Sequence, residues 1–537
     1  MVWGRRKRDA GMTAVSEKSA VPAAGAVGFR RVDPRIVVGA IVVALVGGYF
    51  YLYSSSNLWL DEALSLNIAR LPLSQLHDAL KHDGAPPLFY VLLHFWTGAF
   101  GTRAIAARSL SALCMATAAV TLWFVARRWL GERVAWVTAL LMAVNPYAYR
   151  YATETRMYAL VVLLVAVGIL AVQRAVERPS LGRLAPFGLV VALAVYTQYW
   201  TFYLLPVCIA VFLWMTRTER LRVAGRRLLV ATGVGLLAFV PWVPTFLYQN
   251  AHTGTPWGHA MFPTLPIAYT VRDFAGGVPI GTDLPEGWLL FFILFALLLL
   301  GVFGRATDDR RIEIDIRTQR DARPIAFVGG AGLVVGTSLA YLSGSAFQTR
   351  YSAIVFPFFV LLVARGVSTL QDRRVATGIL VAIVAFGFLG GARNVSTQRT
   401  QAGPVASVLQ HDARPGDVVV YCPDQLGPGV ERLAPKGLQQ FTYPAFGNPK
   451  FVDWVDYVKV LQATDPIAFA KEALARAKGH TLWYVYSSLY TTHPKACLKL
   501  SLAFARARTP KERIVSVRKA LERPLLEEFQ PLPSARG

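Results

Sequence analysis

Residues 36–65 read IVVGAIVVALVGGYFYLYSSSNLWLDEALS, an apolar run followed by two adjacent carboxylates, Asp61 and Glu62. The apolar part is long enough to cross a bilayer as a helix, which needs roughly 17 to 25 residues. Charged side chains at the edge of such a span are energetically expensive and commonly mark a function. The stretch therefore predicts a membrane-spanning helix and raises the question of what the two carboxylates do.

The composition extends this prediction to the whole chain. Of its 537 residues, 54% are hydrophobic and only 16% are charged, and the mean hydropathy is +0.41. These values exclude an ordinary soluble enzyme and predict an all-α polytopic membrane protein. Apolar runs of bilayer length predict eleven spans, near residues 36–53, 104–126, 133–149, 157–173, 184–199, 201–216, 226–247, 288–304, 325–343, 351–367 and 375–391.

The distribution of Lys and Arg predicts the orientation, because cytoplasmic loops retain positive charge. With the basic leader (residues 1–35) inside as a retained signal anchor, the loops predicted to be cytoplasmic after the first span carry 20 Lys or Arg, and the outer loops 150–156, 196–201, 248–287 and 343–351 carry 4. The apolar segment 86–100 is too short to span at ~1.5 Å per residue, and we predict a juxtamembrane or re-entrant helix. The net charge of +24 is then a topology signal and predicts no nucleic-acid partner.

The C-terminal region differs from the rest in composition. Residues 392–537 contain no run long enough to span and are predicted to form a separate extracytoplasmic domain of small α/β type. Apolar runs at 417–422 and 481–486 predict buried strands, while 466–478 and 494–508 have helical periodicity.

Two of the four cysteines, Cys422 and Cys497, fall in this C-terminal region. An oxidising compartment permits a disulfide between them, but sequence spacing alone leaves a bridge and two separate thiols equally open. Cys114 and Cys208 lie in predicted spans, where a packing role is the natural interpretation.

The loop after the first span predicts two short helices. Apolar residues from Leu60 to Ile68 fall on one face of a helix that should lie on the membrane surface, and a second helix ends at Gly84. Asp61 and Glu62 then occupy a first helical turn, where carboxylates cap amides and complement the helix dipole. Taken alone, the pair is most simply interpreted as a cap.

Five motifs follow one another along the chain: WLDEALSL (59–66), HDGAPPLFYVLLHFW (82–96), RSLSAL (108–113), NPYAYRYATETRMYAL (145–160) and QTRYSAIVFPF (348–358). The series resembles the GT-C membrane glycosyltransferases of the bacterial branch similar to protein O-mannosyltransferases and to lipid A aminoarabinose and galacturonic acid transferases. The resemblance covers about residues 36–391, and Thr155 stands where Ala is usual.

The resemblance implies inverting transfer of a sugar from a polyprenyl-phosphate donor to a hydroxyl of a glycan, lipid or protein, at the outer face of the plasma (inner) membrane. Such chemistry needs a base for the acceptor hydroxyl and a group that stabilises the departing phosphate. Catalysis is assigned to Asp61 and Glu62, with Asp61 as the base. Six residues are assigned to substrate binding: Asp83, Glu154, Arg156, Tyr158, Arg350 and Tyr351.

Each assignment has a simpler alternative. Glu154 and Arg156 could form an interfacial salt pair, Arg350 could snorkel to the interface, and Asp83 could be a helix-ending turn residue. If Arg350 binds the donor phosphate, its guanidinium can do so through two hydrogen bonds. No cofactor is required by this chemistry, although three carboxylates around one site could bind a divalent cation.

Two other functional classes stay open on sequence alone. A lipid or glycan transporter or flippase should carry ionisable or broken helices near mid-membrane, whereas the candidates here gather at the predicted outer edge. A membrane-anchored assembly or sensor protein would not need the acidic pair. The loop 248–287 could be a mobile lid or ordered packing beneath the C-terminal domain, and the sequence leaves the oligomeric state open.

Overall fold

The computed structural model describes residues 34–276, 285–308, 311–487, 494–513 and 525–530. The chain divides into two compact units, residues 1–42 and 43–537, and of the first unit only the start of a helix is described. The basic leader therefore lies almost wholly outside the described residues, and its role as a signal anchor stays a prediction.

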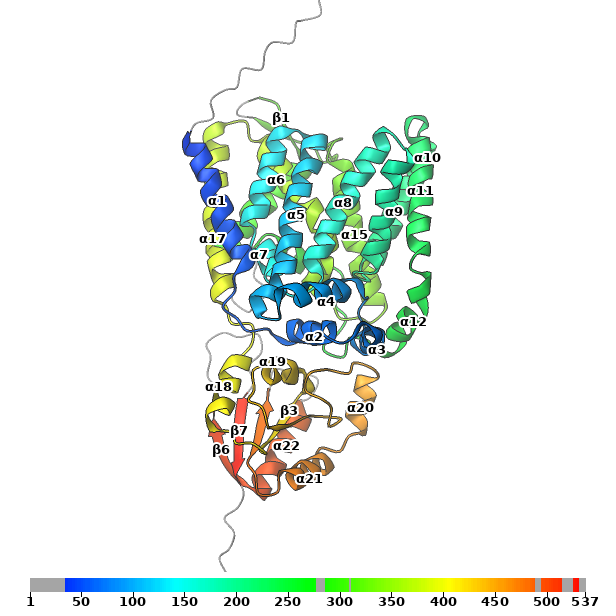
Figure 1. Cartoon of the computed structure of the whole chain (residues 1–537). Helices are drawn as coiled ribbons and strands as arrows, with labels where there is room; N and C mark the ends of the chain where they lie inside the picture. Colours follow the sequence, from blue (N-terminus) through cyan, green and yellow to red (C-terminus); the bar gives the residue numbers. More distant parts are fainter. Residues whose placement is uncertain (1–33, 277–284, 309–310, 488–493, 514–524, 531–537) are drawn as a thin grey trace, which may run out of the picture. The chain divides into compact units, whose positions relative to one another are not determined.

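Each of the eleven predicted spans contains a helix, and Figure 1 shows several of these helices running side by side. Among the described residues, six segments are long and apolar enough to cross a membrane, and shorter apolar helices occupy four of the other predicted spans. The chain is thus a multi-pass membrane protein. The helices are α1 (Pro34–Leu52), α5 (Ala104–Leu130), α6 (Glu132–Val144), α8 (Tyr158–Glu177), α9 (Leu181–Val195), α10 (Thr201–Arg217), α11 (Arg222–Leu237), α14 (Pro285–Phe303), α15 (Arg323–Leu342), α16 (Phe356–Thr369) and α17 (Arg373–Ser396).

One predicted span is wrong in its outer boundary. The sequence predicts a single span over residues 133–149, but α6 ends before Asn145 and a separate helix, α7 (Pro146–Ala152), follows it. The Asn145 side chain accepts a hydrogen bond from the amide of Tyr147 at 2.8 Å, and Pro146 occupies the first turn of α7. Asn at the N-cap and Pro at the first helical position both start helices, so the chain turns here before α8.

Three short helices lie between the first two spans: α2 (Leu60–Ala69), α3 (Leu73–Asp83) and α4 (Leu88–Phe100). Figure 1 shows α2 and α4 running across the ends of the bundle helices, as predicted for a juxtamembrane segment. Gly84 ends α3 in the left-handed conformation at φ +77°, which favours glycine. Every residue of α2 except Asp61 is buried, so the prediction of a one-sided surface helix is wrong for α2.

The loop predicted at 248–287 is largely helical where the structure describes it. Helix α12 (Val243–His252) continues from the 3-10 turn η2 (Val240–Trp242), and α13 (Thr264–Phe274) follows. The imidazole of His252 lies 3.0 Å from the carboxylate of Asp456 in the C-terminal region. This contact favours ordered packing over a lid for this part of the loop.

A five-stranded sheet organises the C-terminal region, with the order β4-β3-β5-β7-β6. Strand β3 pairs in parallel with β4 and β5, and β7 runs antiparallel to β5 and β6. The two predicted strands and two predicted helices are confirmed. The elements are α18 (Ala402–Asp412), β3 (Val418–Cys422), η4 (Asp424–Leu426), α19 (Gly427–Glu431), β4 (Gln439–Thr442), α20 (Tyr457–Ala463), α21 (Pro466–Ala477), β5 (Leu482–Tyr486), α22 (Pro494–Ala507), β6 (Thr509–Arg513) and β7 (Leu525–Gln530).

Both faces of this sheet are buried, which explains why β3 and β5 are apolar throughout. Val418 and Tyr484 belong to a core that includes residues of α21 and α22. Val419 and Trp483, one residue along each strand, belong to the opposite core with residues of α18. The Sγ atoms of Cys422 and Cys497 are bonded across the first of these cores, so of the two alternatives left open, the bridge is the one in the structure.

The C-terminal region packs directly on the helices of the first loop. The Asn67 amide in α2 donates to the carbonyl of Lys450 at 2.9 Å, and Arg432 donates to Asn67 Oδ1 at 2.9 Å. His82, in α3, lies 2.8 Å from the carboxylate of Asp453. Residues 43–537 thus form one compact unit, and the predicted division at residue 392 stays a prediction.

Candidate active site

Asp61 lies at the centre of a group of charged side chains that the sequence places far apart. Its Oδ2 atom is 3.1 Å from Nη1 of Arg350 and 4.0 Å from Nε of Arg156. The Asp61 side chain is 17% exposed, so it can be reached from solvent although it is paired. Arg350 comes from the 3-10 helix η3 (Thr349–Val355), and Arg156 lies in the turn before α8.

Both arginines have hydrogen-bonding capacity left over. Arg350 lies over the rings of Trp59 and Tyr351, at 5.4 and 5.8 Å from the ring centres, and Arg156 Nη1 donates to Ser65 Oγ at 2.9 Å. In the described part of the chain, the buried Nε atoms of Arg350 and Arg156 have no hydrogen-bond acceptor. A buried donor without a partner is unfavourable, and an oxyanion between these arginines would satisfy both atoms.

Glu62, the next residue, has a different environment. Arg108 in α5 donates to both of its oxygens, from Nε at 2.7 Å and from Nη2 at 2.6 Å. The amide of Thr155 donates to Oε1 at 3.0 Å, and Arg399 Nη1 lies 3.9 Å from Oε2. Complete burial raises the pKa of Glu62, but the charge and hydrogen bonds of Arg108 outweigh burial and lower this pKa to about 2. Glu62 is thus a fixed, fully occupied carboxylate.

Asp83 is the other predicted acidic group near Asp61. The Tyr90 hydroxyl donates to Asp83 Oδ2 at 2.5 Å, and Arg156 Nη1 donates to the same hydroxyl at 3.3 Å. Burial raises the pKa of Asp83, and the nearby charge of Arg156 offsets this only in part. Asp83 and Asp61 therefore share Arg156 as a neighbour, which a turn-ending role for Asp83 does not require.

Glu154 is buried beside Arg150, whose Nη2 lies 2.8 Å from its Oε2. The two residues are one helical turn apart, on α7 and the turn that follows it. A salt pair is thus observed, as the simpler alternative predicts, but its partner is Arg150 and its side chains are 8% and 1% exposed rather than interfacial. Glu154 and Glu62 are thus both buried, whereas Asp61 is partly exposed.

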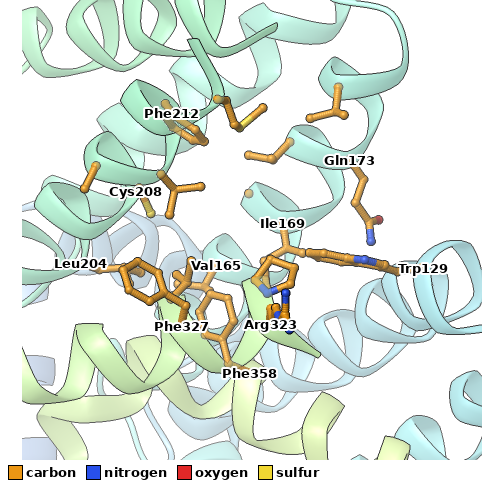
Figure 2. A pocket seen from close by; sticks show the side chains of 18 of the residues that line it. Trp129, Val165, Ile169, Gln173, Leu204, Cys208, Phe212, Arg323, Phe327 and Phe358 are labelled. Atoms are coloured by element: carbon orange, nitrogen blue, oxygen red, sulfur yellow. The ribbon is translucent and has the colours of Figure 1, made fainter. Parts of the chain in front are cut away.

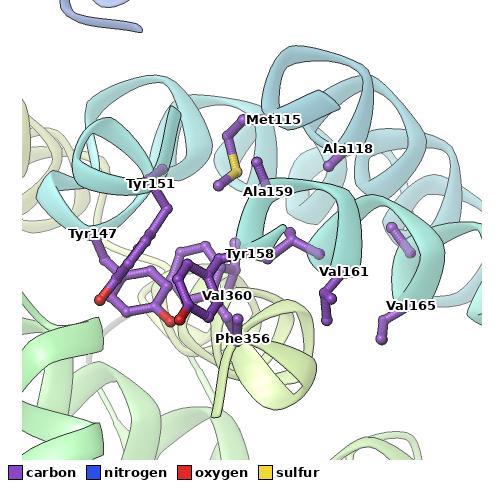
Figure 3. Packing of buried hydrophobic residues seen from close by; sticks show 14 of the residues in the cluster. Met115, Ala118, Tyr147, Tyr151, Tyr158, Ala159, Val161, Val165, Phe356 and Val360 are labelled. Atoms are coloured by element: carbon purple, nitrogen blue, oxygen red, sulfur yellow. The ribbon is translucent and has the colours of Figure 1, made fainter. Parts of the chain in front are cut away.

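Aromatic side chains of the main hydrophobic core lie next to this site. Figure 3 shows Tyr147, Tyr151, Tyr158 and Phe356 gathered where α7, α8 and α16 meet. The ring of Tyr151 contacts both Tyr147 and Tyr158, with centres 4.5 and 5.2 Å apart. Among the described residues, the buried hydroxyls of Tyr147 and Tyr158 have no hydrogen-bond partner. Of the two, Tyr158 lies near Asp61, Arg156 and Arg350.

The structure thus brings the eight predicted site residues together but divides them between two layers. Asp83, Arg156, Tyr158, Arg350 and Tyr351 lie around the accessible carboxylate of Asp61, whereas Glu62 and Glu154 are paired with buried arginines. In the described residues, no group of three or more His, Cys, Asp or Glu side chains has a geometry that could hold a metal ion. Whether the chemistry requires a cofactor stays a prediction.

Three arginines were missed by sequence reasoning. Arg108 pairs with Glu62, Arg150 pairs with Glu154, and Arg399 donates to Thr153 Oγ1 at 2.7 Å while lying completely buried. Arg108 has a usable sequence signal, because it is an ionisable residue inside an apolar run. Arg399 follows the last span in a polar stretch, where no sequence feature distinguishes it from a solvated residue.

Residues 84–244 match the family described as dolichyl-phosphate-mannose-protein mannosyltransferase. No curated protein sequence matches the chain. The chain is similar in structure to ArnT from Cupriavidus metallidurans in the apo state, with 15% identity, coverage of 92% of this chain and 98% of that chain, and a TM-score of 0.57. ArnT bound to undecaprenyl phosphate gives 15% identity, 93% and 98% coverage and a TM-score of 0.56.

A weaker likeness, with a TM-score of 0.48 and 12% identity, links 90% of this chain to 73% of the oligosaccharyltransferase of Archaeoglobus fulgidus in complex with Zn and sulfate. At these identities, the structural likeness to ArnT establishes the fold. The family match over residues 84–244 runs from α4 to the start of α12 and includes Arg108, Glu154 and Arg156. The chain is therefore a multi-pass membrane protein with the GT-C fold of ArnT, and its residues 84–244 match the family of protein mannosyltransferases.

Proposed function

We propose that this protein transfers a sugar from a polyprenyl-phosphate donor to a hydroxyl acceptor, with inversion, at the site around Asp61. The observation that carries the proposal is the accessible Asp61 carboxylate held between Arg350 and Arg156. The description of the matching family names a dolichyl-phosphate-linked sugar, and the structurally similar ArnT binds undecaprenyl phosphate. Both relatives support a lipid-phosphate donor for this chain.

Asp61 acts as the general base in this proposal. The acceptor hydroxyl loses its proton to the Asp61 carboxylate while its oxygen bonds to the anomeric carbon of the sugar. The bond from that carbon to the phosphate oxygen breaks on the opposite face, and the polyprenyl phosphate leaves with the electron pair. A carboxylate is suited to this role because it is ionised at neutral pH and lies within reach of solvent.

Arg350 and Arg156 stabilise the departing phosphate. A phosphate that binds Arg350 draws this side chain away from Asp61, so Asp61 loses its ion-pair partner and becomes free to accept a proton. The unpartnered Nε atoms of both arginines supply donors for the phosphate oxygens. Donor binding thus prepares the base, and this coupling keeps Asp61 paired while the site is without donor.

The neighbouring residues have supporting roles. Asp83 with Tyr90, and the free hydroxyl of Tyr158, offer polar contacts for the sugar or the acceptor. Glu62, with both oxygens occupied by Arg108, fixes α2 against α5 and so sets the position of Asp61. We therefore assign Glu62 a positioning role rather than a direct part in proton transfer.

We place this site on the extracytoplasmic side of the plasma membrane. Two features support this orientation: the four predicted outer loops after residue 149 carry 4 Lys or Arg, against 20 in the predicted cytoplasmic loops, and the Cys422–Cys497 disulfide suits an oxidising compartment. A cysteine introduced at Asn250 should react with an impermeant maleimide on intact cells, whereas one at Thr318 should react only after permeabilisation. The reverse labelling pattern would overturn the orientation.

The proposed activity is tested by transfer from purified donors. Protein in detergent is incubated with radiolabelled polyprenyl-phosphate pentoses and hexoses and with a membrane extract from a strain that lacks the protein. We expect one of these sugars to appear on extract components, and not when Asp61→Asn protein replaces wild type. Failure of the wild-type protein to transfer any sugar of the panel would contradict the proposal.

A further inference from the structure

A large cavity lies inside the membrane region, apart from the site around Asp61. It has a volume of about 1510 Å³ and is lined mainly by α8, α9, α10 and α15. None of the site residues lines it. Sites for small ligands are typically ~300 to 1,000 Å³, so this cavity has room for a ligand with long chains.

The walls of the cavity are apolar over most of their area. Figure 2 shows Leu204, Phe327 and Phe358 grouped on one side of the space, with Trp129 and Gln173 on another. Phe327 is 55% exposed in the described structure, and in a bilayer such a surface faces hydrocarbon. A hydrocarbon chain is therefore the natural occupant of this part of the cavity.

One end of the cavity is strongly basic. Four arginines line it against a single carboxylate, Glu177: Arg128, Arg317, Arg320 and Arg323. Arg128 Nε donates to Glu177 Oε1 at 2.7 Å, which accounts for that carboxylate. Within the described ranges, no carboxylate lies within ion-pair distance of the other three arginines. The end thus has an excess of positive charge, and among the described residues Arg317, Arg320 and Arg323 have no ion-pair partner.

The basic end lies far from Arg350. Arg323 begins α15 and Leu342 ends it, and Arg350 follows shortly after Leu342 in the chain. A helix of this length spans about 30 Å, so the two sets of arginines lie near opposite ends of a membrane-crossing helix. All four cavity arginines fall in loops that the charge distribution predicts to be cytoplasmic. A phosphate bound here cannot be the phosphate that reacts beside Asp61.

Exposed apolar side chains accompany these arginines. Ile316 is 90% exposed and Ile314 is 69% exposed, and Ile316 itself lines the cavity next to Arg317. Both belong to the segment around the short strand β2 (Ile312–Ile314). A mixture of exposed isoleucine and arginine suits the boundary between headgroups and acyl chains, where each type finds a favourable environment.

We propose that the cavity binds an anionic phospholipid of the cytoplasmic leaflet. Its headgroup phosphate contacts Arg317, Arg320 and Arg323, and an acyl chain lies between α8, α10 and α15. Basic pockets between membrane helices on the cytoplasmic side commonly bind anionic headgroups, and guanidinium groups match phosphate oxygens geometrically. The lipid fills a space that the packing of the helices leaves open, and so supports the bundle on which the outer site is built.

The test is lipid retention. The full-length protein is reconstituted in nanodiscs made of equal amounts of phosphatidylcholine and phosphatidylglycerol. Native mass spectrometry of the released protein then identifies the lipids that stay bound to it. Both lipids have a headgroup phosphate, but the choline cation of phosphatidylcholine cancels its charge and is repelled by the arginines, so we expect phosphatidylglycerol to be retained roughly tenfold over phosphatidylcholine. Equal retention of both lipids would overturn the proposal.

Matched variants locate the bound lipid. The double variant Arg317→Gln, Arg320→Gln removes two exposed arginines with little risk to the fold and should bring the retention ratio near one. The control Arg226→Gln removes an exposed arginine of α11 outside the cavity and should leave the ratio unchanged. Ile169→Trp should reduce retention by filling the apolar part, whereas Leu189→Trp, on an exposed face of α9, should not.

A competitor separates this lipid from the donor. Undecaprenyl phosphate added to the same nanodiscs should leave the amount of retained phosphatidylglycerol unchanged. If it displaces phosphatidylglycerol one for one, the cavity holds the chain of the donor and the proposal is wrong. Retention by Asp61→Asn protein should equal that of wild type, because the cavity and the outer site share no residue.

Discussion

Asp61 and Glu62 are neighbours in the sequence and have the same functional group, yet their surroundings differ. Asp61 is 17% exposed, and its nearest ion-pair partners lie at 3.1 and 4.0 Å with unpartnered Nε atoms. Glu62 is fully buried and accepts three hydrogen bonds from Arg108 and Thr155. Successive side chains of a helix are about 100° apart, so one carboxylate faces the opening and the other faces the bundle.

The difference between the two side chains lies in the hydrogen bonds that each carboxylate already accepts, rather than in the residue type. A carboxylate that already accepts three hydrogen bonds, and whose pKa is lowered to about 2, is a poor proton acceptor. Asp61 contacts the arginines Arg350 and Arg156, and it can give up such a contact when substrate binds. Isosteric amides at the two positions should therefore have opposite effects on activity and on stability.

Asp61→Asn should have the largest effect of these changes, and it should fall on catalysis. The amide cannot accept the acceptor's proton, and general-base contributions are typically ~10² to 10⁴ in rate. Asn also suits a helix start about as well as Asp, so expression and the unfolding midpoint should stay near wild type. The measurement is sugar transfer from the lipid donor by the purified variant, alongside its thermal unfolding.

Transfer by Asp61→Asn within a few-fold of wild type would assign Asp61 to helix capping. The base would then be sought at Asp83 or Glu154. Binding of the radiolabelled donor to the same preparation serves as the control, because a variant that binds donor and does not transfer has lost chemistry rather than structure.

Glu62→Gln should mainly reduce stability. The change leaves the buried guanidinium of Arg108 without a counter-charge, and breaking a buried ion pair from one side costs about 3 to 5 kcal/mol. We expect a lower unfolding midpoint in detergent and less protein in the membrane. Activity per folded molecule should fall less than in Asp61→Asn.

The double variant Glu62→Gln, Arg108→Met sharpens this result. It removes both charges, so its loss of stability should be smaller than the sum of the two single losses, since paired residues are not additive. If the two single losses of stability add up fully in the double variant, Glu62 and Arg108 do not stabilise each other. The proposed difference between Glu62 and Asp61 would then be wrong.

The pH dependence of the unfolding midpoint should show how much the charge of Glu62 stabilises the folded protein. The pKa of Glu62 is lowered from an ordinary 4.5 to about 2 in the folded protein, which corresponds to about 3 kcal/mol. Because the folded pKa is the lower one, this stabilisation is present above about pH 4.5 and is lost as the pH falls toward 2. The difference in unfolding midpoint between wild type and Glu62→Gln should therefore shrink over this window. A constant difference would show that the charge of Glu62 does not stabilise the fold.

Arg350→Lys should have the smallest effect. It keeps a positive charge near Asp61 but loses the fork of the guanidinium, so the affinity for the lipid donor should weaken by about 1 to 3 kcal/mol. Equilibrium binding of radiolabelled donor measures this change, and Arg272→Lys in α13 provides a control outside the site. Unchanged donor affinity in Arg350→Ala would assign Arg350 to snorkelling.

Several features of this protein follow from the sequence alone. Apolar runs mark a helix in each of the eleven predicted spans, shorter apolar runs mark β3 and β5, and helical periodicity marks α21 and α22. These signals are local, because the bilayer and the buried sheet each impose a requirement on consecutive residues. The ordered motifs, through the family resemblance that they carry, assign Asp61, Arg156 and Arg350 to one site.

The tertiary structure alone decided how the charges are paired. The break at Asn145 and Pro146 was missed because an apolar run continues through it, and its effect is to bring Glu154 to Arg150. Arg108 and Arg399 reach Glu62 from positions 46 and more than 300 residues away. Whether a carboxylate has an ion-pair partner depends on such residues distant in sequence, because ion pairing is set by distance in space and by burial. The sequence determined the fold and the set of candidate residues, and packing determined which of two adjacent acids is left open to substrate.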